Sequence, residues 1–362
     1  LLIAVGHRLL KEGKQEGAGI LEVLARNGFS EVARATLTSI GVEVEKGADE
    51  CYLCRNTFAK LEELANRCLE KLSEYEYESF LTGVHAPPSI ENREDELRAK
   101  HHLAWGESIR NEFSREIGKR IQTATGKNVD PKRPDILVMV NPFNEEVSLT
   151  VNSLFIAGRY RKLVRGIPQS RWLCRQCQGR GCERCGGTGK LYQESVEELI
   201  GNPVMTSAGG TGFTLHAAGR EDIDVRTLGD GRPFIVEVKR PKRRFLDLHQ
   251  LTVDINQSAQ GKIEARDLRS SSKAETKRMK EIGQNSKTYR ATVEFDNDVD
   301  DSQLKRLETE LSGQEVKQLT PTRVAHRRAS KVRKKYIYEL KTRRLQPKRA
   351  ELIVRCQGRL YM

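Results

Sequence analysis

Apolar side chains in the first third of the chain recur at helical spacing. The stretch 107–124 predicts a helix that ends at Gly126, with a buried face of Ile109, Phe113, Ile117 and Ile121. Two more helices are predicted over 20–35, where the spacing is irregular, and over 58–80, where one face carries Leu61, Leu64, Leu69 and Leu72. The first third is therefore expected to be largely helical.

Alternation of apolar and polar residues takes over after this helical part. Strands are predicted over 136–140 and 147–151, joined by a turn, and then over 213–216, 232–238, 288–295, 332–340 and 350–356. Short helices are expected at 194–200 and 302–311, and the polar, Ser-rich stretch 257–287 is expected to be a mobile insertion. A helical first third that is followed by a part rich in strands indicates an α+β chain.

Composition indicates what kind of partner the protein binds. The 362 residues suffice for two or three domains, and 63 Lys and Arg against 50 Asp and Glu give a net charge of +13. The last stretch, 321–362, holds 14 basic and 2 acidic residues, interrupted by Tyr336 and Tyr338. A solvated charged face is one explanation, but basic residues beside aromatic rings favour RNA.

The chain has no apolar run long enough to cross a bilayer and no signal peptide, so we expect a cytoplasmic protein without a membrane partner. No obligatory protein partner is evident. The sequence starts without Met, which suggests a fragment. Six of its eight cysteines form C-x-x-C pairs, a pattern of metal binding in a reducing compartment.

Two of these pairs predict a closed zinc site. Four thiolates fall within twelve residues among glycines that allow tight turns: Cys174, Cys177, Cys182 and Cys185. Four protein ligands leave no open position, so the zinc is expected to be structural; free thiols in a linker are the alternative. Cys51 and Cys54 form only half a site, and they either bind metal with a partner pair outside the chain or are unligated.

A polar turn at 219–226 offers candidate chemistry, because it carries Arg220 and Asp222 between two predicted strands. A carboxylate kept ionised by a nearby guanidinium can act as a covalent catalyst or a base without a metal. A salt-bridged turn aspartate is the plain alternative. Asp224 is a weaker candidate, since two residues further on it is expected to lie in a strand and to point to the other face.

This turn, together with Lys-Thr-Tyr-Arg-Ala at 287–291 and the basic run at 159–169, resembles the archaeal tRNA pseudouridine synthases of the Pus-ten type. The resemblance extends from about 51 to 361. It implies an α+β fold in which a mixed-sheet catalytic domain follows an α/β THUMP-like RNA-binding domain and a zinc loop with four cysteine ligands. The expected parts are a helical segment at 1–50, the THUMP-like domain at 51–170, the zinc loop at 171–192 and the catalytic domain at 193–362.

The resemblance also implies an activity and a set of site residues. Asp222 is expected to be the nucleophile that isomerises uridine 54, uridine 55 or both in the T-arm of tRNA, with attack at either C6 or C1′. Arg220 would hold Asp222 and fill the space of the flipped uridine, and Tyr289 would stack on the base. The other expected substrate-binding residues are Lys287, Arg290, Arg159, Tyr160, Arg161 and Tyr361.

Structural zinc is the expected metal, and no organic cofactor is implied, because isomerisation needs neither redox chemistry nor an activated donor. The competing hypothesis is a noncatalytic, zinc-containing tRNA-binding protein. A THUMP-bearing methyltransferase is disfavoured by the lack of a glycine-rich nucleotide loop after a strand. The family pattern continues beyond Tyr361, so we expect the chain as given to bind tRNA but to be weakly active or inactive.

Overall fold

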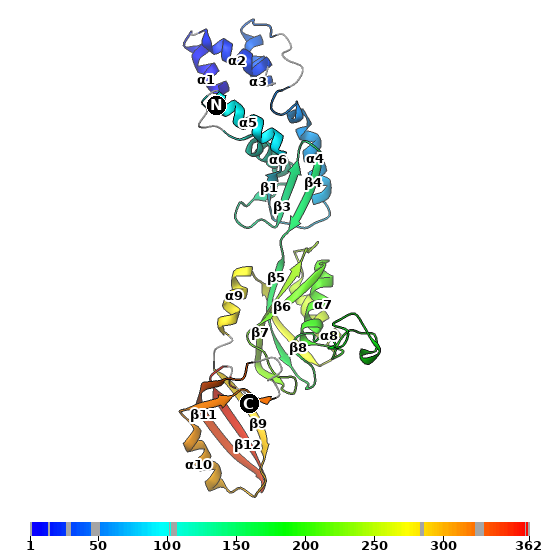
Figure 1. Ribbon diagram of the computed structural model, residues 1–362, viewed down its shortest axis with the longest axis vertical. Helices are drawn as coiled ribbons and strands as arrows, with labels where there is room; N and C mark the ends of the chain where they lie inside the picture. Colours follow the sequence, from blue (N-terminus) through cyan, green and yellow to red (C-terminus); the bar gives the residue numbers. More distant parts are fainter. Residues whose placement is uncertain are drawn as a thin grey trace. The chain divides into compact units, whose positions relative to one another are not determined.

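The computed structural model describes residues 2–13, 15–26, 30–44, 51–100, 102, 107–282, 286–322, 329–358 and 360. They form two compact units, Leu1–Asn152 and Ser153–Met362 (Figure 1). Each unit has its own core. No described helix combines the length and apolar content that crossing a membrane requires.

Three short helices open the first unit: α1 (Leu2–Lys11), α2 (Glu16–Arg26) and α3 (Glu31–Ser39). Their small core consists of Leu21, Ala25, Ala33 and Leu37. The prediction of a single helix over 20–35 is wrong, because α2 ends at Arg26 and Ser30 is the N-cap of a second helix, α3. The backbone of Ser30 is extended, and its hydroxyl accepts a hydrogen bond from the Ala33 amide at 3.2 Å, which is the geometry of an N-cap.

The rest of this unit packs helices against a sheet. Its elements are η1 (Thr57–Lys60), α4 (Leu61–Leu72), β1 (Ser79–Val84), α5 (Pro88–Lys100), α6 (Ile109–Thr125), β2 (Asn128–Val129), β3 (Ile136–Asn141) and β4 (Glu146–Val151). The sheet order is β2-β1-β3-β4, with β1 parallel to both neighbours and β3 antiparallel to β4. The helix over 107–124 and the hairpin are confirmed. The helix over 58–80 is too long, because residues from Ser79 onward pair in β1.

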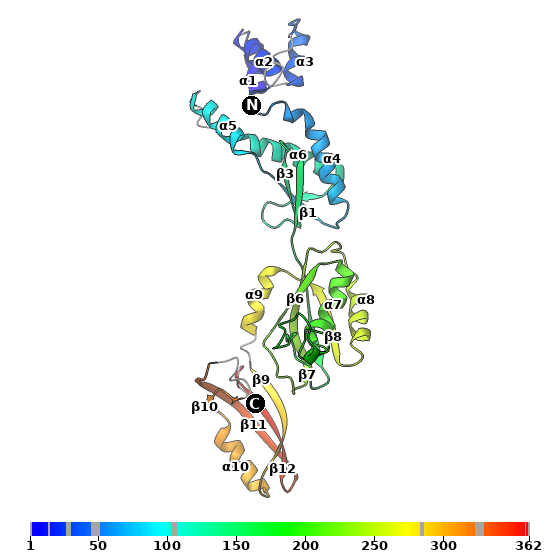
Figure 2. The ribbon, with the colours of Figure 1, turned by 45° about the vertical axis from the view of Figure 1, so that its right-hand side comes forward.

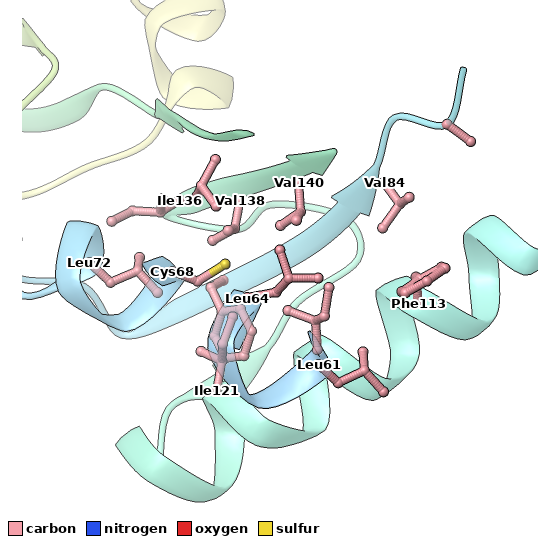
Figure 3. Close-up of a cluster of buried hydrophobic side chains, with 14 of the residues drawn as sticks. Leu61, Leu64, Cys68, Leu72, Val84, Phe113, Ile121, Ile136, Val138 and Val140 are labelled. Carbon is pink, nitrogen blue, oxygen red and sulfur yellow. The ribbon is translucent and has the colours of Figure 1, made fainter. Parts of the chain in front are cut away.

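The core of this sheet confirms the helical periodicity. Leu61, Leu64, Cys68 and Leu72 of α4 meet Phe113 and Ile121 of α6 and the buried side of β3 (Figure 3). The Phe113 ring is fully buried and stacks on Phe58 with a centroid distance of 3.9 Å. Residues four apart on α6 face the sheet because the helical repeat returns them to one side.

The second unit begins with a four-stranded antiparallel sheet in the order β6-β7-β5-β8. Its elements are β5 (Leu154–Lys162), α7 (Val196–Ala208), β6 (Gly212–Ala217), β7 (Thr227–Lys239), α8 (Leu248–Ser258), β8 (Ile263–Ser270) and α9 (Lys273–Ile282), with η2 (Glu183–Cys185) in the cysteine loop. The expected THUMP-like domain extends to 170 and therefore includes 154–162. The structure places β5 inside this sheet instead, because it pairs on both edges, with β7 and β8.

The described part of the stretch 257–287 is mostly regular structure, in contrast to the mobile insertion that its polar composition suggested. Residues 263–270 form β8, and 273–282 form α9. Ile263 and Ala265 are buried, whereas Asp267 and Arg269 are exposed, and β8 is an edge strand. Edge strands commonly carry charged residues because these discourage pairing with another chain.

A second antiparallel sheet, in the order β10-β11-β12-β9, ends the chain (Figure 2). Its elements are β9 (Lys287–Glu294), α10 (Asp301–Leu311), β10 (Gln314–Leu319), β11 (Val332–Gln346) and β12 (Arg349–Cys356). The strands and the helix predicted here are confirmed. Leu307 and Leu311 of α10 cover a core that includes Ile337, Leu340 and Val354.

Replacing Phe113 by Ala should destabilise the THUMP-like sheet by about 3–5 kcal/mol, because a fully buried ring leaves a cavity. Hydrogen exchange of the β3 amides, followed by mass spectrometry, measures this free energy of opening. Val129→Ala, at an exposed position of the same sheet, is the control and should change it by less than about 0.5 kcal/mol. Equal effects of the two changes would contradict this core.

Candidate active site and metal centre

The loop between β6 and β7 carries the candidate nucleophile. Asp222 is half-buried, and its carbonyl accepts a hydrogen bond from the Val225 amide at 3.3 Å. Asp224 is exposed and lies in a turn, since β7 starts only at Thr227. The expectation that Asp224 lies in a strand is therefore wrong, although its greater exposure still separates it from Asp222.

Glu221, the neighbour of Asp222, is the buried carboxylate of this loop. The Tyr160 hydroxyl lies 2.9 Å from each of its oxygens, and the Gln169 amide donates to it at 3.0 Å. Arg232 Nε lies 2.8 Å from Oε2 as an ion pair, with its N–H not directed at the oxygen. Burial raises the pKa of Tyr160 well above its usual range, and the Glu221 charge raises it further, so the phenol remains a donor.

Lys162, at the end of β5, anchors the Asp222 loop through hydrogen bonds from inside the core. Its side chain is fully buried, and its ammonium donates to the carbonyls of Ile167, Asp222 and Ile223 at 3.0, 3.0 and 3.2 Å. The Gly166 amide adds a bond to the Ile223 carbonyl at 2.9 Å. Burial lowers the pKa of Lys162, an effect that the nearby carboxylates of Glu221 and Asp224 oppose. The backbone of Asp222 is thus tied directly to the sheet.

The basic run at 159–161 is part of β5, so its side chains alternate between the two faces. Tyr160 points into the core and is fully buried, which contradicts its expected direct contact with substrate. Arg159 donates to the carbonyls of Asp230 and Gly231, and Arg161 to the carbonyl of Gly229. Both arginines therefore brace the sharp bend at 229–231 in β7.

Three expected substrate residues come from β9. Tyr289 is half-buried, and burial raises its pKa. The nearby Cys356, Asp222 and Glu221 raise this pKa further. Arg232 lowers it. The phenol is thus close enough to feel the charge of the Asp222 loop. Lys287 starts the strand, and Arg290 is exposed with Nε 3.8 Å from Glu351. Tyr361 lies outside the described residues.

Arg220 contacts the segment that leads into the cysteine loop. Its guanidinium donates to the Ser170 hydroxyl and lies 5.9 Å from the centroid of the Trp172 ring. The expectation that Arg220 also holds Asp222 stays a prediction. These contacts link the candidate catalytic loop to the base of the cysteine loop.

The four cysteines of that loop converge as expected. Their sulfur atoms all lie within 4.8 Å of one another, and three of the four side chains are buried. The Gly181 and Gly189 amides donate to Cys177 and Cys185 at 3.3 and 3.2 Å. Gly189 has a φ of +69°, and an added Cβ would lie 2.4 Å from the Gly179 carbonyl oxygen, so only glycine fits. Four soft donors at this spacing match a tetrahedral metal site.

Cys51 and Cys54 differ from this cluster. Burial raises the pKa of Cys54, and hydrogen bonding with Cys51 adds to the rise. Among the described residues, which leave out 45–50, the only group of three or more candidate ligands within reach of one ion is that of the cysteine loop. The prediction that this pair binds metal stays untested.

Four residues have roles at this site that the sequence did not predict: Glu221, Lys162, Gln169 and Arg232. The alternation along β5 could have placed Lys162 inside, because it shares the buried face with Tyr160. A charged side chain at an inward position needs a partner, and that would have directed attention to the neighbouring loop. Nothing in local sequence identifies the partner itself.

Comparison with known proteins identifies the class of protein to which this chain belongs. Residues 64–141 match the family model "Pus10 THUMP domain, archaeal", and residues 155–362 match "Pus10, C-terminal". An α+β pseudouridine synthase domain preceded by a THUMP domain defines the chain as an isomerase of the pseudouridine synthase class.

The chain belongs to the Pus10 family. It is 42% identical over 364 residues to the tRNA pseudouridine synthase Pus10 of Methanocaldococcus jannaschii, covering 98% of this chain and 76% of the relative. The protein of the same name from Methanothrix thermoacetophila is 43% identical, with 89% and 71% covered. That from Methanopyrus kandleri is 37% identical, with 99% and 81% covered.

Lys162→Met should loosen the Asp222 loop, because three carbonyls lose a charged donor and each such bond is worth about 1.5–3 kcal/mol. We expect hydrogen exchange to accelerate at 219–225 and the thermal midpoint to fall. Lys239→Met removes an exposed lysine at the end of β7 and should leave both quantities unchanged. Unaltered exchange in Lys162→Met would mean that the ammonium does not hold the loop.

Proposed function

We propose that this chain converts uridine to pseudouridine in tRNA and that Asp222 is its nucleophile. The observation that carries the proposal is the fastening of the Asp222 loop. Lys162 holds the main chain of Asp222, and the preceding residue, the buried Glu221, is held by Tyr160 and Arg232. A reacting group must be placed to within a fraction of an ångström, and such anchoring supplies that precision.

The reaction exchanges one bond of the uridine for another. The Asp222 carboxylate adds to C6 of the base or to C1′ of the ribose, and the bond between C1′ and N1 breaks. The base then turns and forms a bond from C5 to C1′, and the bond between the carboxylate and the uridine breaks, which restores the free Asp222 carboxylate. The proton of C5 passes to solvent and N1 takes one up, so atoms and charge balance without a redox cofactor. A uridine in a folded arm must first leave its stack, at a cost of a few kcal/mol.

The other residues take supporting roles in this proposal. Tyr289, near the Asp222 loop, stacks on the extruded base, and Arg220 occupies the space that the base leaves. Lys287, Arg290, Arg159 and Arg161 contact phosphates, while Tyr160 acts through Glu221. The THUMP domain holds the tRNA, and uridine 54, uridine 55 or both in the T-arm are the targets.

We assign structural zinc to Cys174, Cys177, Cys182 and Cys185, because four thiolates in a closed cluster fit that metal. The ion would supply only the fold of the loop, since all four positions are taken by protein. The chain's own contribution is the contact of Trp172 with Arg220, which lets an ordered loop support a catalytic residue.

Asp222→Asn should abolish isomerisation while tRNA affinity changes little, because one carboxylate contributes little to a phosphate-dominated interface. Release of tritium from a tRNA transcript labelled at uridine C5 measures the reaction. Asp224→Asn, an exposed change in the same loop, is the matched control and should stay active. Full turnover by Asp222→Asn would remove this residue from the mechanism.

The zinc assignment predicts about one metal ion per chain, lost when Cys177 and Cys182 are both changed to Ser. Elemental analysis of the purified protein gives the count, and near-ultraviolet circular dichroism reports the packing of Trp172. A Cys51→Ser, Cys54→Ser protein is the control and should keep its metal. Stoichiometric zinc retained by the first variant and lost by the control would move the site to Cys51 and Cys54.

A further inference from the structure

The sheet β10-β11-β12-β9 has two very different faces. α10 packs on one of them, over Ile337, Leu340 and Val354 (Figures 1 and 2). Strand register places Tyr336 beside Glu315, and Arg355 beside Glu339, on the opposite face. We call this opposite side, away from α10, the open face.

An aromatic stack lies on the open face. Tyr336 and Tyr338 are 39% and 38% exposed, and their ring centroids are 5.3 Å apart. The Arg355 guanidinium lies 5.3 Å from the centroid of the Tyr338 ring. The Tyr336 hydroxyl donates to the Gly313 carbonyl at 2.6 Å, which fixes the direction of its ring. A ring that is already oriented loses little entropy when a ligand stacks on it.

The charge of the open face around these rings is positive. From β10 along β11 to Arg343, it carries three carboxylates, those of Glu315, Glu339 and Glu351, against six cations, which are Arg290, Lys317, Lys334, Lys341, Arg343 and Arg355. Several of them form ion pairs, such as Lys334 with Glu315 at 3.1 Å and Lys341 with Glu339 at 2.9 Å. These pairs are exposed and therefore weak, so a phosphate can draw the cations away at little cost.

The helix α10, which covers the other face, is acidic. The helix α10 and its N-cap hold four carboxylates, Asp300, Asp301, Glu308 and Glu310, against two cations, Lys305 and Arg306. The strands beneath the helix carry Arg333, Lys335 and Arg344 on the covered face, so the acidic part of this side is the helix itself, which repels a polyanion. The side that attracts phosphates is also the side that carries the tyrosines.

We propose that the open face binds unpaired nucleotides of RNA, with bases stacking on the ring of Tyr336 or on the Tyr338–Arg355 pair and phosphates contacting Lys334, Lys341 and Arg343. Bases within a duplex are already stacked on each other and cannot use these rings, so the preference is for loops and single strands. The inference rests on the proposed function only in taking the RNA to be the substrate tRNA. It adds a contact surface separate from the Asp222 loop.

Fluorescence anisotropy tests this surface with the full chain, a labelled oligouridine strand and a hairpin duplex of the same number of nucleotides. Stacking is worth about 1–3 kcal/mol per base, so Tyr336→Ala with Tyr338→Ala should weaken binding of the single strand about fivefold or more and leave duplex binding nearly unchanged. Lys305→Ala with Arg306→Ala, on α10, is the matched control and should alter neither affinity by as much as twofold.

Tyr336→Phe with Tyr338→Phe keeps the rings and loses only the hydroxyl contact to Gly313, so it should retain most of the wild-type affinity, which separates stacking from misfolding. Unchanged single-strand binding by the alanine pair, or an equal loss for strand and duplex, would overturn the proposal. These readouts do not involve turnover. An inactive wild-type chain that shows the tyrosine-dependent preference would contradict the proposed function alone, whereas tritium release without the preference would contradict this surface alone.

Discussion

The buried ammonium of Lys162 is the interaction on which the candidate active site depends. Taking a charge out of water costs several kcal/mol, and only close partners offset that cost. Three main-chain carbonyls serve here, and two of them belong to the loop that carries Asp222. Because those acceptors are backbone atoms, the contact constrains the path of the chain as well as a side chain. If the loop moved away, it would leave an unpaired charge in the core.

Glu221 completes this arrangement from the other side of the same loop. Its carboxylate is held by Tyr160 and Gln169 and paired with Arg232, so the residue before Asp222 has its own fixed position. Arg232 also donates to the Ala218 carbonyl at 2.6 Å, and Gln169 to the Gly219 carbonyl at 3.0 Å. Successive residues of the loop are thus held from β5, from the segment after it and from β7. The half-buried Asp222 side chain projects from a rigid support.

Local patterns predicted the elements well and the network poorly. The helix at 107–124 and the paired strands follow from periodicity, because the spacing of apolar residues close together in sequence shows which face is buried. Lys162 and Glu221 could not be found this way, since lysine and glutamate are usually exposed and their partners lie about sixty residues away in sequence. Composition also misled at 263–282, where an edge strand and a helix carry the charges that suggested disorder.

The cysteine loop shows why a structural metal can matter to a distant reaction. The four sulfurs close a segment too small to have a core of its own, and Leu173 pairs with Lys190 across its base. Trp172 at that base meets Arg220 from the Asp222 loop. A well-ordered cysteine loop would therefore help to position Arg220 of the Asp222 loop, through the contact between its guanidinium and the Trp172 ring. Lys162 holds the main chain of the Asp222 loop from a different element, β5, so disorder of the cysteine loop would act first on Arg220.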